Sequence, residues 1–144
     1  MLLKVLVVDD LPSSLLITQN LLAPYSGLRA ETAASGLEAI ELAKNHNYDL
    51  IFMDQMMPGM DGIETTTAIR KIEGYANTPI IALTANAMRG MKEFYLEKGF
   101  QDYLLKPISP EALDKVINRF LGEQLSINNE QVSKNEASSL LIAN

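Results

Sequence analysis

Five segments of the chain have the hydrophobic pattern of β-strands, and stretches with helical spacing separate them. Three of the five are short, nearly continuous apolar runs, which are typical of strands buried on both faces of a sheet. These runs cover residues 2–8, 49–53 and 79–84. Residues 28–33 alternate apolar and polar side chains, which indicates a half-exposed edge strand, and residues 102–106 form a short fifth candidate.

The stretches between these strands have the spacing of helices. The last one shows it most clearly, because apolar residues recur every three or four positions between Ala112 and Leu121. Pro12 suits the first turn of the first helix, and Gly99 lies where a left-handed residue would close the fourth helix. Strands and helices that alternate five times predict an α/β fold, with a parallel sheet, right-handed crossovers and helices on both faces.

The composition changes after Gly122, where Asn, Gln, Ser and Glu become frequent. We therefore expect one domain over residues 1–121 and a polar tail or linker over residues 122–144. Within the tail, Ser133 and Glu136 precede a short apolar run in the form of a capping box. Two interpretations stay open, namely a polar tail with a short helix and the beginning of a further domain.

Composition and charge remove several classes of function. The 144 residues, 47% hydrophobic and 21% charged, suffice for one globular domain. The absence of cysteine and the single histidine, His46, exclude disulfide scaffolds, thiol nucleophiles and zinc sites built on thiolates or several histidines. A net charge of −6 argues against binding to nucleic acid. Because no apolar run approaches ~18 residues and the start lacks a signal-peptide pattern, we expect a cytoplasmic location without membrane contact by this segment.

Polar side chains that can do chemistry lie at the carboxyl ends of the predicted strands. Asp9 and Asp10 follow the first strand and Asp54 follows the third, whereas Thr84 ends the fourth and Lys106 ends the fifth. The carboxyl ends of parallel strands share one edge of the sheet, and ligands bind there at the topological switch point. Taken singly, each residue has a structural explanation, such as a helix cap, a loop aspartate or a solvated lysine. Their joint placement favours a functional site.

The strand order decides how close the carboxylates lie. If the order is 2-1-3-4-5, the first and third strands are neighbours, and Asp9, Asp10 and Asp54 face one another. Such a cluster raises pKa values and costs stability unless a cation neutralises it. Oxygen-only ligands favour Mg²⁺, with Mn²⁺ as a substitute, over a softer metal.

Four motifs in this order resemble those of the receiver domain of two-component response regulators, a family with the flavodoxin-like fold. The resemblance covers residues 3–121 and rests on VVDD (7–10), MDQMMPGMDG (53–62), LTA (83–85) and LLKP (104–107). Each motif alone is weak, whereas the ordered set is specific. The resemblance implies a five-stranded parallel sheet in the order 2-1-3-4-5, with helices on both faces.

The resemblance also implies roles for the acidic residues. Asp54 would be the phosphoacceptor, Asp10 a direct Mg²⁺ ligand and Asp9 its water-mediated partner. The backbone carbonyl of Met56 would complete the protein's share of the metal shell. A carboxylate that attacks a phosphoryl group needs positive charge in place first, because the phosphoryl oxygens carry negative charge in the transition state.

Further residues match the family's contacts to the phosphoryl group and its switch. Thr84 and Lys106 match the hydroxyl and the ammonium that contact the phosphoryl oxygens, and Pro107 fits the family's cis Lys-Pro bond. Tyr103 matches the aromatic that moves when Thr84 shifts toward the phosphoryl group, which reshapes the face of the fourth helix, fifth strand and fifth helix. The same face is a possible homodimer interface. For four side chains the sequence does not decide between apolar surface on that face and packing in the core: Met88, Met91, Phe94 and Tyr95.

The implied function is phosphoacceptance in a two-component system or phosphorelay, with a histidine kinase or histidine phosphotransfer domain as partner. His46 lacks the long helical context of a phosphodonor histidine, so we expect the donor on another domain or protein. Residues 53–62 and 79–88 look like those of receivers in hybrid histidine kinases. A stand-alone response regulator and a Mg²⁺-dependent phosphohydrolase remain alternatives. A receiver assists its own phosphorylation and dephosphorylation without being an enzyme, whereas a full-length histidine kinase is one.

Two positions are expected to control the hydrolysis of the phosphorylated form. By the same resemblance, Met56 and Asn86, two residues after Asp54 and Thr84, border the path of the attacking water. Receivers differ at these positions, where an acid or amide holds water and an apolar side chain covers the site. We give Met56 more weight than Asn86 and expect slow hydrolysis, which suits passing the group onward.

Overall fold

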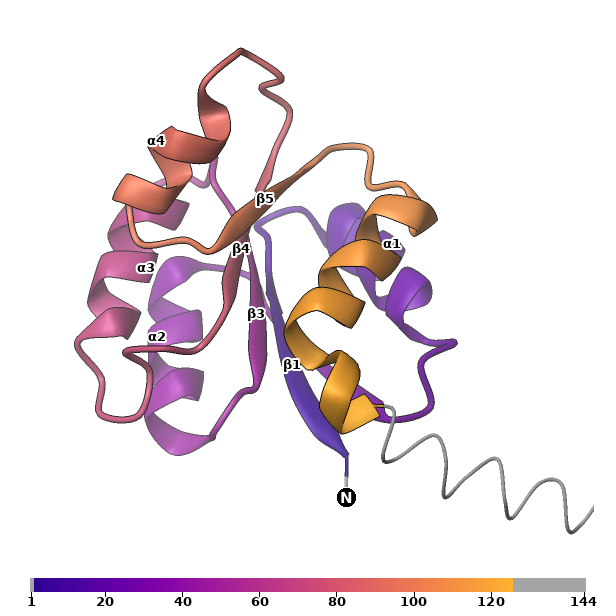
Figure 1. The fold of residues 1–144 in the computed structure, drawn as a ribbon. Helices are drawn as coiled ribbons and strands as arrows, with labels where there is room; N and C mark the ends of the chain where they lie inside the picture. The colour runs from indigo at the N-terminus through magenta and orange to yellow at the C-terminus, as the bar shows by residue number, and fades with distance from the viewer. Residues whose placement is uncertain (1, 126–144) are drawn as a thin grey trace, which may run out of the picture.

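The computed structural model describes residues 2–125, in which strands and helices alternate along the chain (Figure 1). The elements are, in order, β1 (Leu3–Val8), α1 (Pro12–Leu22), β2 (Leu28–Ala33), α2 (Gly36–Asn45), β3 (Leu50–Asp54), α3 (Gly62–Arg70), β4 (Ile80–Thr84), α4 (Met91–Glu97) and β5 (Asp102–Leu105). A further helix covers residues 110–125, called the 110–125 helix below.

The strands form one parallel sheet in the order β2-β1-β3-β4-β5, which confirms the predicted order and the flavodoxin-like fold. β1 pairs with β3 so that Val8 lies opposite Met53. The residues that follow these two, Asp9 and Asp54, therefore come together at the carboxyl end of the sheet. On the other side of β3, Asp54 pairs with Leu83 of β4.

Helices cover both faces of the sheet, and each face has its own apolar core (Figure 1). α1 and the 110–125 helix pack on one face, where Ile117 and Val7 belong to the same buried cluster. α2, α3 and α4 cover the other face, where Ile69 and Tyr95 share a cluster with Val8. Consecutive residues of β1 thus enter opposite cores, as the two-residue period of a strand requires.

The helix signals and the edge strand of the sequence agree with the structure. β2 lies at the sheet edge and is mostly half-buried, as its alternating pattern predicts. Pro12 opens α1, and Gly99, with a φ of 101°, lies just beyond α4. Glycine adopts this left-handed backbone without the steric cost that a side chain adds.

For four side chains the sequence left undecided whether they belong to the core or to the surface, and the structure shows both outcomes. Tyr95 is buried, and Met91 and Phe94 pack against the core as partly buried residues. Met88 is 67% exposed and lies in the stretch between β4 and α4. Three of these four side chains therefore contribute to the core.

The 110–125 helix runs four residues past position 121, where the domain was expected to end. Leu125 is buried in the same cluster as Leu121. The predicted capping box at Ser133 and Glu136 lies outside the described residues. Within the described range, no helix is both long and apolar enough to cross a membrane.

Candidate functional site

The carboxyl ends of the strands bring the predicted acidic residues together. Asp9, Asp10 and Asp54 each offer one carboxylate oxygen, and these three oxygens lie within 4.8 Å of one another. Asp9 and Asp54 are buried, whereas Asp10 is half-buried. The cluster predicted from the strand ends is therefore present, and Asp10 is its most solvent-exposed member.

Lys106 crosses from β5 to the two buried carboxylates. Its Nζ donates to Asp9 Oδ2 at 2.8 Å and to Asp54 Oδ1 at 3.0 Å. The peptide bond between Lys106 and Pro107 is cis, as the resemblance implied. The alternative of a solvated lysine is wrong, because the Lys106 ammonium lies between two carboxylates of the cluster.

Asp9 has a second role in the loop after β1. Its Oδ1 accepts a hydrogen bond from the Leu11 N–H at 3.1 Å. The N-cap residue of α1 is Leu11 itself, and its side chain makes no capping hydrogen bond. The alternative of a helix-capping aspartate at position 9 or 10 therefore does not describe this helix.

Charge is unbalanced at this end of the sheet. Burial raises the pKa of Asp54 to about 6, the Lys106 ammonium opposes the shift, and Asp9 adds to it. Burial alone would lower the pKa of Lys106, but its hydrogen bonds to Asp9 and Asp54, together with the negative charges of these carboxylates, raise it. One ammonium faces three carboxylates, so the cluster retains excess negative charge. An oxygen-only donor set with this charge fits a hard divalent cation such as Mg²⁺.

Thr84 ends β4 next to the carboxylates. It is buried, and its Oγ1 accepts a hydrogen bond from the Asn86 N–H at 3.0 Å. Asn86 Oδ1 in turn accepts from the Met88 N–H at 3.0 Å. α4 begins only at Met91, with Gly90 as its N-cap residue, so the alternative that Thr84 caps the next helix is wrong.

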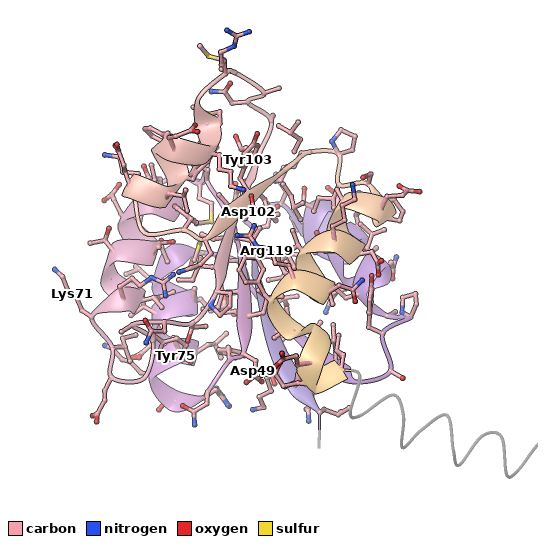
Figure 2. The ribbon with its side chains drawn as sticks, viewed as in Figure 1. Asp49, Lys71, Tyr75, Asp102, Tyr103 and Arg119 are labelled. Carbon is pink, nitrogen blue, oxygen red and sulfur yellow. The ribbon has the colours of Figure 1, made fainter. Side chains whose placement is uncertain are left out.

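Tyr103 lies on β5 beside α4 (Figure 2). Its ring is half-buried, and its centroid is 5.8 Å from that of Tyr95. Next to it, Asp102 accepts a hydrogen bond from Arg119 at 3.1 Å. The face expected to respond to phosphorylation therefore contains an aromatic pair and an ion pair.

The structure places the two expected hydrolysis positions at the surface. Met56 is 74% exposed, whereas the next residue, Met57, is buried. Asn86 is also exposed, and its Oδ1 is engaged by the Met88 N–H. This hydrogen bond occupies one of the two acceptor positions of the Asn86 side-chain oxygen.

Gly62, the last residue of the motif at 53–62, supports the site. Its N–H donates to the Gln55 carbonyl at 3.0 Å, at the start of α3. A Cβ at this position would lie 2.3 Å from the Asp54 carbonyl oxygen. The signal in the sequence is the Asp-Gly pair that opens the helix directly after the acidic motif, where the first turn of α3 presses against the backbone of Asp54.

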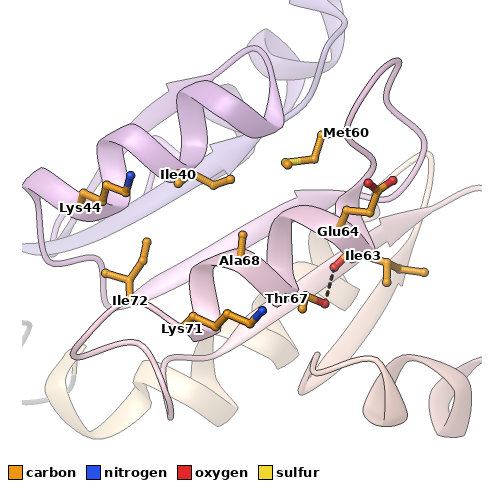
Figure 3. Close-up of a pocket in the computed structure, with 9 residues that line it drawn as sticks. All are labelled: Ile40, Lys44, Met60, Ile63, Glu64, Thr67, Ala68, Lys71 and Ile72. Carbon is orange, nitrogen blue, oxygen red and sulfur yellow. Dashed lines mark hydrogen bonds between the residues drawn. The ribbon is translucent and has the colours of Figure 1, made fainter.

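Two hollows border different parts of the domain. The larger one, of about 620 Å³, is an apolar groove between α2 and α3, with Lys44 and Lys71 on its rim (Figure 3). It contains none of the predicted site residues. A smaller one, of about 320 Å³, adjoins the site between α1 and the loop after β5, and it is lined by Ser14, Ile17, Thr18, Lys106, Pro107 and Ile108.

Comparisons with known proteins agree with this geometry. A family model described as the response regulator receiver domain matches residues 5–118. The sensor protein GacS of Pseudomonas syringae pv. syringae is 42% identical over 122 residues, which are 83% of this chain and 13% of GacS. The chain thus spans about an eighth of the length of that relative.

Two solved structures are similar over most of the domain. The receiver domain of the sensor histidine kinase PA1611 from Pseudomonas aeruginosa, described with magnesium coordinated in the active site cleft, has a TM-score of 0.76 and 36% identity. That match covers 85% of this chain and 99% of the other. A chain from the Saccharomyces cerevisiae co-crystal of the phosphotransfer protein Ypd1 with the receiver domain of Ssk1 has a TM-score of 0.76 and 30% identity, covering 86% and 92%.

Proposed function

The chain belongs to the response regulator receiver domain family, and from this premise we propose that Asp54 accepts a phosphoryl group from a phosphohistidine on a partner. The observation that carries the proposal is the contact of Lys106 with both Asp54 and Asp9 inside a cluster of three carboxylates. This arrangement holds a nucleophilic carboxylate beside a fixed positive charge.

In the proposed transfer, Asp54 replaces the donor imidazole as the bonding partner of phosphorus. An Asp54 carboxylate oxygen forms a bond to phosphorus while the bond from phosphorus to the imidazole nitrogen of the donor breaks, and the electron pair stays on that nitrogen. Lys106 donates to one phosphoryl oxygen and the Thr84 hydroxyl to another, so both act mainly by position and charge. Asp9, Asp10, Asp54 and the Met56 carbonyl would hold Mg²⁺, which supplies positive charge to a phosphoryl oxygen when bound.

The direct test uses a small phosphodonor. Incubation with acetyl phosphate and Mg²⁺ should add one phosphoryl mass to the wild-type protein and none to Asp54→Asn. Asp114→Asn, which removes an exposed carboxylate on the 110–125 helix, is the matched control and should be labelled as the wild type is. Equal labelling of Asp54→Asn and wild type would refute the assignment. Mn²⁺ is the substitute cation to compare in the same assay.

We propose that the histidine-bearing partner docks on α1. Leu11, Leu16 and Ile17 are 53%, 58% and 56% exposed, which is unusual for large apolar side chains on one helix of a small domain. Ile17 also lines the hollow of about 320 Å³ that contains Lys106. Leu16→Glu should therefore slow transfer from a phosphotransfer protein and leave labelling by acetyl phosphate unchanged. A loss of both reactions would point to misfolding instead of docking.

We propose that this domain is a module of a hybrid histidine kinase, as its similarity to part of the sensor protein GacS suggests. A stand-alone regulator remains the alternative, and the full reading frame around this segment separates the two. The domain by itself is proposed to be a phosphoacceptor that assists its own phosphorylation and dephosphorylation, not an enzyme. Turnover of a small phosphate ester would instead identify a phosphohydrolase. The cysteine-free chain fits the cytoplasmic location that we propose.

The lifetime of the phosphorylated form is a separate proposal. We infer that the Met56 side chain excludes the attacking water and that hydrolysis is slow. The hydrogen bond from the Met88 N–H supports this inference, because it takes up one acceptor position of the Asn86 side-chain oxygen and ties that side chain to the turn after β4. Met56→Asn should lose its phosphoryl group faster than wild type in excess Mg²⁺. An unchanged rate would show that Met56 is not the barrier.

We also propose that the face of α4, β5 and the 110–125 helix supports a homodimer. A hollow of about 460 Å³ there is lined by residues that include Lys92, Tyr103 and Leu105. Leu105 is 41% exposed, and the ion pair of Asp102 with Arg119 lies on the same face. Sedimentation before and after phosphorylation tests this proposal, and a monomer in both states would contradict it.

A further inference from the structure

The two ends of α4 are held very differently. At its amino end, residues 85–90 are all exposed, and the N-cap residue Gly90 has a φ of 87° with no side-chain cap. At its carboxyl end, Tyr95 and Phe100 are buried and their rings meet edge to face at 5.3 Å. The Phe100 N–H also donates to the Tyr95 carbonyl at 3.0 Å, so the chain turns tightly where the helix stops.

Arg70, the last residue of α3, attaches this carboxyl end to the rest of the domain. Its Nε and Nη2 donate to the Gly99 carbonyl at 3.1 and 2.8 Å, and Nη2 also donates to Gln101 Oε1 at 2.7 Å. Nη1 donates to the carbonyls of Tyr75 and Thr78 at 2.7 and 2.6 Å. These five bonds use every N–H that a guanidinium has.

Gln101 extends the attachment to the central part of the sheet. Its side-chain Oε1 accepts from the Ile80 N–H at 2.7 Å, and its backbone N–H donates to the Ile80 carbonyl at 3.0 Å. The start of β4 and the loop before β5 are therefore joined through the same side chain that Arg70 contacts. The group formed by Arg70, Gly99, Gln101 and Ile80 is called the Arg70 anchor below.

The Arg70 anchor is not an ion pair. Among the described residues, no carboxylate lies within 4.0 Å of the guanidinium, and all of its acceptors are neutral oxygens. The Arg70 side chain is half-buried, so water could not replace all of the hydrogen bonds that its N–H groups would lose if these acceptors moved away. Any movement of Gly99 or Gln101 away from Arg70 is correspondingly unfavourable.

We propose that Arg70 fixes the carboxyl end of α4, so that phosphorylation of Asp54 rearranges residues 85–91 while residues 98–101 keep their place. The inference rests on the proposed function, because Thr84, at the site, leads directly into residues 85–90. A shift of Thr84 breaks its bond with the Asn86 N–H, and within residues 2–125 no comparable anchor holds the six exposed residues that follow. Movement therefore passes along this segment and stops at the anchored end of the helix.

Amide hydrogen exchange, measured with and without acetyl phosphate and Mg²⁺, tests the proposal. In the wild type, phosphorylation should change exchange in residues 85–91 by at least about tenfold and in residues 98–101 by less than about twofold. Arg70→Lys keeps the charge but has only three N–H donors on one nitrogen. It should speed exchange of residues 98–101 by about tenfold even without phosphorylation, and the phosphorylation response should spread into them.

Two further variants keep the test decisive. Lys71→Met changes the charge at the next residue, whose exposed side chain points away from the domain, and should behave as the wild type does (Figure 2). Gln101→Met removes one acceptor and should give a smaller change of the same kind if Arg70→Lys does not fold. Equal responses at both ends of α4 in the wild type would overturn the proposal, as would Arg70→Lys and Gln101→Met variants that match Lys71→Met. The mass of each sample reports phosphorylation separately, so unlabelled wild type counts against the proposed function and the inference together.

Discussion

The two ends of the sheet differ in how far neighbouring cations neutralise their carboxylates. Toward the amino end, in the group of side chains near the starts of β1 and β3, Glu31 of the edge strand β2 accepts a hydrogen bond from the Tyr48 hydroxyl at 2.7 Å and has Lys4 and Arg29 nitrogens at 4.0 and 3.7 Å. Two cations and a hydroxyl thus surround one carboxylate. At the carboxyl end, Lys106 is the one cation among the described residues that pairs with the cluster of three carboxylates, through Asp9 and Asp54. Negative charge is in excess at the carboxyl end, where a ligand is expected, whereas the Glu31 carboxylate is fully compensated by its neighbours, and this contrast separates a functional cluster from a structural one.

Hydrogen bonds of the backbone complete the amino end. Asp49 accepts from the Lys4 N–H at 2.8 Å, and the Tyr75 hydroxyl donates to the His46 carbonyl at 2.5 Å. Figure 2 shows Asp49 and Tyr75 at the end of the sheet opposite to Tyr103. The backbone of His46 is therefore part of a structural network.

The largest effect is expected at the backbone beneath the acidic cluster. Gly62→Ala places a methyl group 2.3 Å from the Asp54 carbonyl oxygen, and a backbone atom cannot move aside cheaply. We expect a loss of roughly 2–4 kcal/mol in the free energy of unfolding, measured in urea. Gly122→Ala is the control, because its nearest contact is 4.0 Å away in the 110–125 helix. That change should stabilise by roughly 0.5–1 kcal/mol, and similar losses in both variants would contradict the close approach.

Replacing the carboxylate by an amide should stabilise the carboxyl end. The pKa of Asp54 is raised from 3.8 to about 6, so the folded state binds more protons than the unfolded state between these values. Ionisation of Asp54 therefore lowers the free energy of unfolding as the pH rises from 3.8 to about 6. Without Mg²⁺, Asp54→Asn should gain on the order of 1–3 kcal/mol at pH 7 and lose this pH dependence. A variant less stable than wild type at pH 7 would break the comparison.

Mg²⁺ should bind at the carboxyl end of the sheet and leave the group around Glu31 unaffected. Mg²⁺ is expected to raise the melting temperature of the wild type, because it binds the folded carboxylate cluster. Asp10→Ala should weaken Mg²⁺ binding by about tenfold or more, as measured by calorimetry, since it removes a proposed direct ligand. Glu31→Gln at the other end should bind Mg²⁺ as the wild type does. If Asp10→Ala binds equally well, the metal assignment fails.

The smallest effect is expected at the amino end, with the opposite sign to Asp54. The hydrogen bond from Tyr48 lowers the pKa of Glu31 below its usual 4.5, burial opposes this, and Lys4 reinforces it. This stabilisation is complete above pH 4.5 and is lost as pH falls through the lower folded pKa. Glu31→Gln should therefore cost about 0.5–1.5 kcal/mol at pH 7, measured by urea unfolding. A gain in stability would mean that the Glu31 carboxylate destabilises the fold as Asp54 does, and it would contradict the comparison.

The features predicted from sequence are those set by periodicity. Strands buried on both faces are continuous apolar runs, so β1, β3 and β4 were predicted to within a residue at each end. The cluster of Asp9, Asp10 and Asp54 was predictable because the carboxyl ends of neighbouring parallel strands must meet.

The features missed depend on contacts between distant loops. Arg70 has the pattern of a solvated arginine at a helix end, and its partner Gly99 lies 29 residues away. The need for glycine at position 62 depends on how closely α3 approaches the Asp54 backbone, a distance that the Asp-Gly pair before α3 does not by itself give. Neither contact follows from a period of two or of 3.6 residues.

The 110–125 helix determines where this domain can be joined to another protein. Leu121 and Leu125 lie one helical turn apart, and both are buried against the sheet. A chimaera cut after residue 121 would discard the second of these side chains and open the base of the core to water. A crossover after residue 125 keeps that packing whole, so the module to exchange between signalling proteins is longer than its motifs suggest.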